Sequence, residues 1–247
     1  MFDDKLKKIK NESFYFKTLP NQLLKLLKLY FRLEVENAHL VPKKGSVVIV
    51  PNHSGFSGLD AVMLNHVLVN DVKRVPRVLT HKFWFTTNFS EKVAKKMGFF
   101  EANYENGLQF LKRKNAVVIF PEGEAGNFKP SRKMYSLQEF KRGFIRMAIE
   151  TQSPIVPTLI IGAEETNFTL KQLTMKTIFK GLRIPLPLNL VPLPAKWRII
   201  FLDPIYLPYD VAILEDHTFI REIAADIQEL MQERMNAEIR KRGSIYF

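Results

Sequence analysis

Residues 46–60 read SVVIVPNHSGFSGLD. The segment opens with a β-branched run at 46–50, which follows a turn at 42–45 and is stopped by Pro51. A short apolar run between turn signals is typical of a strand that is buried on both faces of a parallel sheet. A helical pattern then starts near Ser57. The segment therefore predicts a strand, a polar turn over residues 52–55 and a helix.

Similar strand and helix patterns recur along the chain. Apolar or alternating runs predict further strands at 77–80, 116–120, 154–161 and 196–202. Between and after them, 3.6-residue periodicity predicts helices at 90–97, 104–114, 136–151 and 216–242.

Capping signals and apolar spacing refine these helices. Ser90 is the expected N-cap of the helix at 90–97, and Gly98 lies past its end. Ser136 and Glu139 have the spacing of a capping box. On the last helix, the residues expected to face inward are Ile220, Ile223, Ile227, Leu230 and Met231.

Strands that alternate with helices predict an α/β fold, with a mostly parallel β-sheet flanked by helices. The chain has 247 residues, with no internal repeat and no linker rich in Gly or Ser, so we expect a single domain. Its expected parts are a basic amphipathic N-terminal segment (1–45), an α/β core with the candidate catalytic residues (46–205) and a C-terminal helix (206–247).

Positive charge is concentrated in the N-terminal part of the chain. The formal net charge is +12; up to Arg146 there are 26 basic and 13 acidic residues, and the remainder has 11 and 12. This asymmetry indicates a polyanionic partner, such as nucleic acid, an anionic bilayer or a phosphate-rich substrate, or else a solvated basic surface. No zinc-finger spacing, RNA-binding signature or basic zipper is present, so no nucleic-acid partner is expected.

Missing residue types narrow the chemistry. The chain has no Cys, which excludes a thiol nucleophile, a thiolate zinc site, an iron–sulfur cluster and disulfides. The longest run without Asp, Glu, Lys or Arg has 15 residues, 45–59, and a membrane span needs roughly 18 or more. Residues 1–10 do not resemble a signal peptide. We therefore expect a soluble or surface-bound protein.

Two apolar segments have alternative interpretations. Residues 20–32 predict a helix with one apolar face edged by lysines, which suits a membrane surface and a packed core equally well. Residues 178–194 contain only two charged residues and four prolines, and the prolines forbid a regular helix. They are expected to form either a loop packed on the core or an apolar lip that contacts acyl chains or a bilayer. In the segment 20–32, the apolar face consists of Leu23, Leu26, Leu27, Tyr30 and Phe31.

His53 and Asp60 are the candidate catalytic pair. In open parallel sheets, ligands bind outside the carboxyl ends of the strands, where we expect residues 52–55, 121–123 and 162–165 to meet. An Asp60 in the first helical turn can accept a hydrogen bond from one imidazole nitrogen and leave the other nitrogen free as a general base. Alternatively, Ser57 and Asp60 form a capping box, and Asp60 only caps the helix. A metal site with His66 and a serine-hydrolase elbow around Ser57 fit the residues less well.

A second polar loop follows the strand at 116–120 and reads FPEGEAGNFK from 120 to 129. Gly123 and Gly126 allow backbone N–H groups to converge on an oxyanion or a phosphate, although a tight turn without a ligand explains them as well. Nearby side chains that can add positive charge are Lys129, Arg132, Lys133, Lys141 and Arg142.

Taken together, three motifs resemble the glycerolipid (lysophospholipid) acyltransferase superfamily. They are NHSGFSGLD, then VVIFPEGEAG about sixty residues later, then FKRGFIRMAIETQSPIVPTLI, and WRIIFLDPI resembles a late strand of that family. The resemblance implies that His53 is the general base, that Asp60 orients it, and that Glu122 and Gly123 belong to the acceptor-binding wall. The other residues that it assigns to substrate binding are Asn52, Ser54, Gly55, Phe120, Pro121, Gly126, Lys129 and Arg142.

Two features depart from the family pattern. Six residues separate His53 from Asp60 where the family usually has four, as in a branch with an HSG-type motif. The arginines that glycerol-phosphate binders carry after FPEG and in the block at 98–103 are absent. Either Lys129 substitutes as a point charge, or the acceptor lacks a phosphomonoester.

The resemblance implies an O-acyltransferase. Acyl-CoA or acyl-ACP would be the co-substrate and a lysophospholipid or related glycerolipid the acceptor, with no covalent acyl-enzyme, no metal and no bound cofactor. The basic N-terminal part would hold the protein on an anionic membrane surface, in a cytoplasmic, peripheral location. The alternatives are a lipid hydrolase or thioesterase with the same base, and a non-catalytic lipid-binding protein of the membrane periphery.

Overall fold

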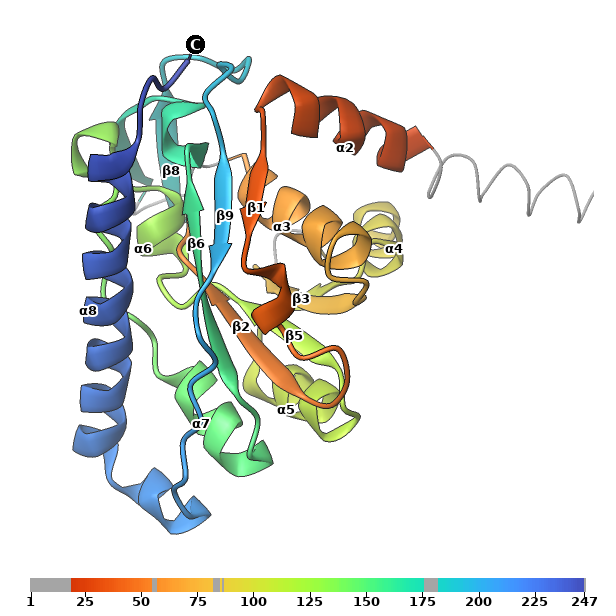
Figure 1. Ribbon diagram of the computed structural model, residues 1–247, viewed down its shortest axis with the longest axis vertical. Coiled ribbons are helices and arrows are strands. Elements are labelled where there is room, and N and C mark those ends of the chain that lie inside the picture. Colours follow the sequence, from red (N-terminus) through yellow and green to blue (C-terminus); the bar gives the residue numbers. More distant parts are fainter. Residues whose placement is uncertain (1–18, 55–56, 82–84, 86, 176–181, 247) are drawn as a thin grey trace, which may run out of the picture.

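The computed structural model describes residues 19–54, 57–81, 85, 87–175 and 182–246. Seven strands form one sheet in the order β1-β9-β6-β2-β5-β3-β4, with helices on both faces (Figure 1). Neighbouring strands are parallel, except that β9 is antiparallel to β6. The expected α/β class is confirmed. The strands are β1 (Glu34–Glu36), β2 (Val47–Pro51), β3 (Pro76–Thr80), β4 (Phe99–Glu101), β5 (Ala116–Ile119), β6 (Ile155–Ile161) and β9 (Arg198–Phe201).

Seven α-helices lie in the described part of the chain. They are α2 (Leu19–Tyr30), α3 (Leu59–Asn70), α4 (Asn88–Lys96), α5 (Tyr104–Lys112), α6 (Glu124–Asn127), α7 (Gly143–Thr151) and α8 (His217–Lys241). Short 3-10 turns occur at η2 (Ala38–Leu40), η4 (Ser131–Lys133), η5 (Ala163–Glu165) and η6 (Val211–Glu215).

The central strand β2 explains how the core is divided. All five of its residues are buried, as expected for a strand covered on both faces. Because side chains alternate along a strand, Val47 and Ile49 join a cluster covered by α2, α3 and α4. Val48 and Val50 join a second cluster, covered by α5, α7 and α8. In Figure 1, α8 runs along one side of the sheet and α3 and α4 lie on the other.

The strand order brings three loops to one edge of the sheet. Strand β2 lies between β6 and β5 and is parallel to both. The segments that follow these strands, at 52–54, 120–123 and 162–165, therefore lie beside one another at the carboxyl edge. This is the arrangement expected from the sequence.

Three details of the helices differ from the expectations. Ser90 lies inside α4, which begins at Asn88. Helix α7 begins at Gly143, and no capping box forms at Ser136, because backbone N–H groups of the preceding segment donate to side chains from other elements. Leu230 is 41% exposed and does not face inward.

Helix α2 has apolar residues on two faces. Leu24 and Leu27 pack against the cluster on the α3 side, and Phe31 beyond the helix is fully buried. Leu23, Leu26 and Leu29 are exposed, with exposed fractions of 56%, 63% and 74%, and Tyr30 is 42% exposed. The expected single apolar face is therefore divided: part of it packs on the core, and part faces solvent.

Strands β7 (Thr169–Met175) and β8 (Leu182–Pro187) form a separate antiparallel pair. The stretch that follows β8 is exposed at Leu188, Leu190 and Val191, by 63%, 79% and 75%. The expectation of a loop packed on the core is wrong for this stretch, which is an apolar lip; residues 178–181 of the same predicted segment lie outside the described residues. Tyr30 of α2 donates a hydrogen bond to the carbonyl of Pro192 (2.7 Å), so the lip and α2 are neighbours.

The two ends of the described chain meet at one corner of the sheet. The amide of Trp197 donates to the carbonyl of Phe31 (2.9 Å), and the two rings stack with their centroids 4.6 Å apart. The neighbouring amide of Lys196 donates to the carbonyl of Ile245 (2.7 Å). In Figure 1 the C-terminus lies near this corner. Among the helices described, none combines the length and apolar composition that a membrane crossing requires.

Candidate active site

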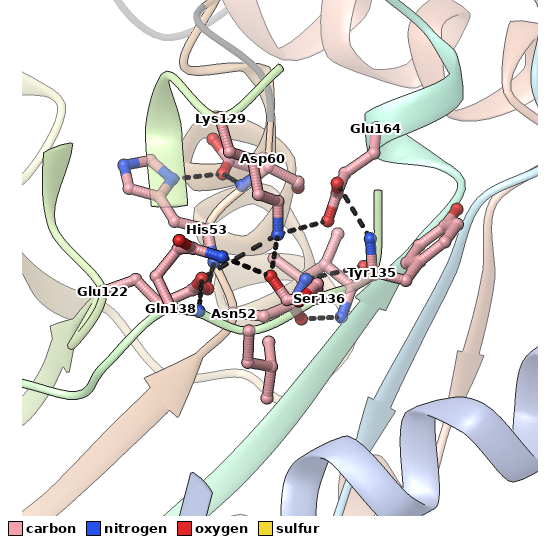
Figure 2. A network of polar contacts seen from close by, with 12 residues as sticks. Asn52, His53, Asp60, Glu122, Lys129, Tyr135, Ser136, Gln138 and Glu164 are labelled. Carbon is pink, nitrogen blue, oxygen red and sulfur yellow. Dashed lines mark hydrogen bonds and ion pairs between the residues drawn. The ribbon is translucent and has the colours of Figure 1, made fainter. Parts of the chain in front are cut away.

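His53 and Asp60 form a close pair at the carboxyl edge of the sheet. The Nδ1 atom of His53 lies 2.6 Å from Oδ2 of Asp60 (Figure 2). Since an ionised carboxylate only accepts, this contact assigns the proton to Nδ1 and leaves Nε2 unprotonated in the neutral ring. The His53 side chain retains 14% of its exposure, whereas Asp60 is fully buried. This is the geometry of a general base that is held and oriented by a carboxylate.

Asp60 does not form the capping box that was the alternative. The residue before α3 is Gly58, with φ 69°, and it makes no side-chain cap. Besides the imidazole, Asp60 accepts the backbone N–H groups of Ser54 and Ala61, both at 2.8 Å. The six-residue spacing thus brings the two side chains together, because the chain turns back between β2 and α3. These two amides also hold the carboxylate in its orientation toward His53.

The residues beside His53 tie the strands together. The side chain of Asn52 is fully buried and exchanges two hydrogen bonds with the backbone of Ile160, at 3.1 and 2.7 Å. The ring of Phe120 lies 4.3 Å from the His53 ring, centroid to centroid. Asn52 fixes β2 to β6, and Phe120 forms one wall of the imidazole site.

Glu122 holds the backbone of His53 from inside the protein. Its side chain is fully buried, and the carboxylate accepts the backbone N–H of His53 at 2.8 Å and that of Gln138 at 2.7 Å. Gly126 leaves the space for it, because a Cβ at that position would lie 2.6–2.8 Å from atoms of the Glu122 side chain. Glu122 is therefore directed into the protein and does not line an acceptor surface.

Lys129 is directed into the protein as well. Its Nζ lies 2.8 Å from Oε1 of Glu164 and 3.8 Å from Oε2 of Glu122, and it donates to the carbonyl of Ser136 at 3.3 Å (Figure 2). Glu164 also accepts the amide of Tyr135, at 3.1 Å. Burial raises the pKa of Glu164 to about 7, although Lys129 lowers it in part. With these buried partners, the Lys129 ammonium does not face a substrate phosphate, which corrects that expectation.

The other residues assigned to substrate binding divide by exposure. Arg142 is exposed at the start of α7, and Gly123 is partly exposed, with φ 56° and the Lys141 side chain beside it. Gly55 lies outside the described residues. Residues that are buried, and that therefore build the floor of the site, are Asn52, Ser54, Phe120, Pro121, Glu122, Gly126 and Lys129.

Of the backbone amides expected to hold an oxyanion, that of Gly123 is already used, because it donates to the carbonyl of Phe120 at 3.1 Å. The neighbouring amides of His53 and Ser54 donate to Glu122 and Asp60. The Ser54 hydroxyl is buried and has no partner among the described residues. The structure thus leaves the oxyanion donor unassigned.

The structure adds residues that sequence patterns did not single out. Tyr135 and Gln138 join the network through their backbone amides, a kind of contact that leaves no sequence signal. His81, just after β3, lies 2.9 Å from the carboxylate of Glu124 and gives this edge a second His–carboxylate pair. His66 faces Asn70 with its Nδ1, at 3.0 Å, and burial lowers its pKa. Within the described ranges, no three His, Cys, Asp or Glu side chains are grouped to hold a metal ion.

A close His–Asp pair at the carboxyl edge of an α/β sheet, next to an FPEG loop, agrees with the comparison of the chain with known proteins. A model of the Acyltransferase family matches residues 32–161, which include both motifs and the strands that carry them. The chain belongs to the Acyltransferase family. The resemblance seen in the sequence is confirmed at that level.

Individual relatives are consistent with this family. Uncharacterized proteins of Mycobacterium tuberculosis and Mycobacterium bovis are 32% identical over 234 residues, which cover 89% of this chain and 65% of theirs. An uncharacterized protein of Mycobacterium leprae is 30% identical over 233 residues and 64% of its own length. The chain thus spans slightly less than two thirds of these relatives. The crystal structure of PlsC from Thermotoga maritima, a 1-acyl-sn-glycerophosphate (LPA) acyltransferase, has the same fold, with a TM-score of 0.59 and 15% identity over 92% of this chain and 84% of that one.

Proposed function

We propose that the protein is an O-acyltransferase that transfers a fatty acyl group from a thioester, acyl-CoA or acyl-ACP, to a hydroxyl of a lysophospholipid or related glycerolipid. The observation that carries the proposal is the 2.6 Å contact between His53 Nδ1 and Asp60, within the residues that match the Acyltransferase family. The activity named for the Thermotoga maritima protein supports the choice of a glycerolipid acceptor.

The reaction follows from the orientation of the imidazole. The Nε2 atom of His53 takes the proton of the acceptor hydroxyl while the oxygen attacks the thioester carbonyl carbon. The buried carboxylate of Asp60 stabilises the imidazolium that forms. When the tetrahedral intermediate collapses, the carbon–sulfur bond breaks and the proton passes from Nε2 to the leaving thiolate. The products are an ester and a free thiol, and no protein nucleophile is required.

The acceptor's phosphate has no guanidinium partner at the expected positions. The windows 124–126 and 98–103, in which the family's glycerol-phosphate binders carry arginine, contain none here, and Lys129 is held by Glu122 and Glu164. Bidentate capture of a phosphomonoester therefore lacks its usual donors. This supports an acceptor without a terminal phosphomonoester, such as a lysophospholipid whose phosphate is a diester.

A membrane surface is the proposed place of action. The exposed leucines of α2 and the lip at 188–191 are apolar and adjacent, and the net charge of +12 favours an anionic leaflet. An amphipathic helix of this kind binds in the plane of the membrane without crossing it. The proposed location is peripheral, on the cytoplasmic side, where the acyl thioesters are.

His53→Ala tests the catalytic assignment. Removal of the base should lower kcat for acyl transfer by at least a factor of about 100, in line with general-base contributions. Transfer is measured from a labelled acyl thioester to a panel of lysolipids, and folding is checked by thermal unfolding. His217→Ala, at an exposed position that starts α8, is the matched control. Undiminished turnover in His53→Ala would disprove the mechanism, and release of free fatty acid without an acceptor would identify a hydrolase instead.

A further inference from the structure

Glu122, Lys129 and Glu164 form a buried charge cluster that the sequence motifs explain only in part. Their side chains are 0%, 3% and 4% exposed. Glu122 belongs to the FPEG motif, Lys129 lies beyond α6, and Glu164 follows β6 in η5. Figure 2 shows Lys129 between the two carboxylates. The cluster contacts the backbone of His53 through the carboxylate of Glu122.

Glu122 uses both oxygens of its carboxylate as acceptors. One oxygen accepts the amide of His53 and the other that of Gln138. A carboxylate offers acceptors only and therefore suits two N–H donors. The position of the His53 backbone therefore depends on where the Glu122 carboxylate is held.

A buried carboxylate stays ionised only when a cation or sufficient donors offset the loss of water. In the described part of the chain, Lys129 is the cation that ion-pairs with Glu122, and its ammonium is held at 3.8 Å by the closer contact with Glu164, at 2.8 Å. Glu164 is in turn fixed by the amide of Tyr135. The order of contacts runs from Glu164 to Lys129, then to Glu122, and ends at the amide of His53.

We propose that Lys129 and Glu164 are positioning residues: Glu164 holds the Lys129 ammonium, Lys129 holds the buried Glu122 carboxylate in place, and Glu122 fixes the backbone from which the His53 imidazole projects. The proposal rests on the acyltransferase function proposed above and deepens it. It gives Lys129 a role in kcat rather than in the binding of substrate, and it extends the functional set to Glu164, outside both sequence motifs.

Lys129→Met is the primary test. Without the cation, the buried Glu122 carboxylate loses the ion pair that holds it in place, so the His53 backbone should shift. We expect kcat to fall by at least a factor of about ten, the order expected when a catalytic group is displaced by a fraction of an ångström. The KM for the lysolipid should change less than about twofold, because no substrate contact is lost. Lys129→Arg should recover most of kcat. Lys112→Met, which breaks an exposed pair with Glu150, is the matched control.

A double variant separates positioning from simple stability. In Lys129→Met with Glu164→Gln, the unpaired Glu164 charge is removed, and the unfolding midpoint should recover relative to the single variant. Glu122 still lacks its cation, so kcat should remain lowered. A double variant that regains both stability and wild-type kcat would reduce the cluster to a structural role. A rise in KM alone, for phosphate-bearing acceptors, would instead make Lys129 a substrate ligand.

A readout without turnover keeps the proposal independent of the proposed function. The exchange rate of the His53 backbone amide, measured by NMR, should rise in Lys129→Met, because the hydrogen bond of this amide to Glu122 weakens. If the wild type transferred no acyl group, the function would fail while this measurement still tested the cluster. Unchanged exchange in Lys129→Met would overturn the proposal even if His53 proved essential for transfer.

Discussion

The carboxylate of Asp60 has its partners arranged on both oxygens. Oδ2 receives the imidazole and the amide of Ser54, and Oδ1 receives the amide of Ala61. Two of the three donors are backbone groups, so the carboxylate cannot rotate without leaving a buried amide unpaired. The orientation of the His53 ring is therefore set by the backbone on either side of the turn between β2 and α3.

Asp60→Asn tests this orientation without changing the size of the side chain. The amide nitrogen of Asn would face Nδ1 as a donor, so His53 would take the tautomer with the proton on Nε2 and could not accept the substrate proton. We expect kcat to fall by a factor on the order of 100 or more, with little change in KM. A pure helix cap would tolerate Asn with little loss of rate. The tautomer is read directly from the ¹⁵N chemical shifts of the His53 ring.

At the scale of single residues, the sequence predicted the contact between residues that are close together in the chain. His53 and Asp60 belong to one strand–turn–helix unit, so their meeting followed from the turn alone. The contact between Lys129 and Glu164 joins segments 35 positions apart, and it required the sheet order, which no single motif specifies. The burial of Glu122 also escaped prediction, because an FPEG turn reads the same whether its carboxylate points inward or outward.

At the scale of the elements, the short helix α6 packs closely against the Glu122 side chain because residue 126 is a glycine. Gly126→Ala would put a Cβ within 2.6–2.8 Å of the Glu122 side chain, which is itself enclosed. We expect a loss of about 1–3 kcal/mol in the free energy of unfolding, typical of overpacking, together with a lower kcat as Glu122 moves. Chemical denaturation and steady-state kinetics measure the two effects. Gly243→Ala, with no atom within 4 Å of the added Cβ, is the control and should be close to neutral.

Elements with strong apolar patterns were predicted, and elements set by distant contacts were not. Strands β2, β5 and β6 are apolar runs rich in β-branched residues, and their positions were predicted to within one residue at each end. Strands β1 and β4 have three residues each, too few to show a period. The capping signal at Ser136 was overridden because amides of that segment donate to Glu122, Gln228 and Gln232. Tertiary partners there replace the helical hydrogen bonds.

At the scale of the whole molecule, the exposed apolar face of α2 and the lip at 188–191 form the proposed membrane contact. Leu26→Glu with Leu29→Glu places two carboxylates on the exposed face of α2. Binding to anionic vesicles should weaken at least about tenfold, because apolar area is lost and negative charge is added. Vesicle sedimentation at two salt concentrations measures it, with added salt weakening the wild type too. Val211→Glu, at an exposed apolar residue of η6 far from α2 in Figure 1, is the control. Equal loss in both variants would contradict the assigned surface.

The corner where Phe31, Trp197 and Ile245 meet bears on how the protein is made. The amides of Trp197 and Lys196 bond to carbonyls from opposite ends of the described chain. On a translating ribosome, residues near position 31 emerge long before residue 245, so this corner stays open until residue 245 has emerged. Contacts of such long sequence separation are among the last to repay their loop-closure entropy. A nascent chain halted short of residue 245 would therefore leave this corner, with the ring of Phe31, less well covered.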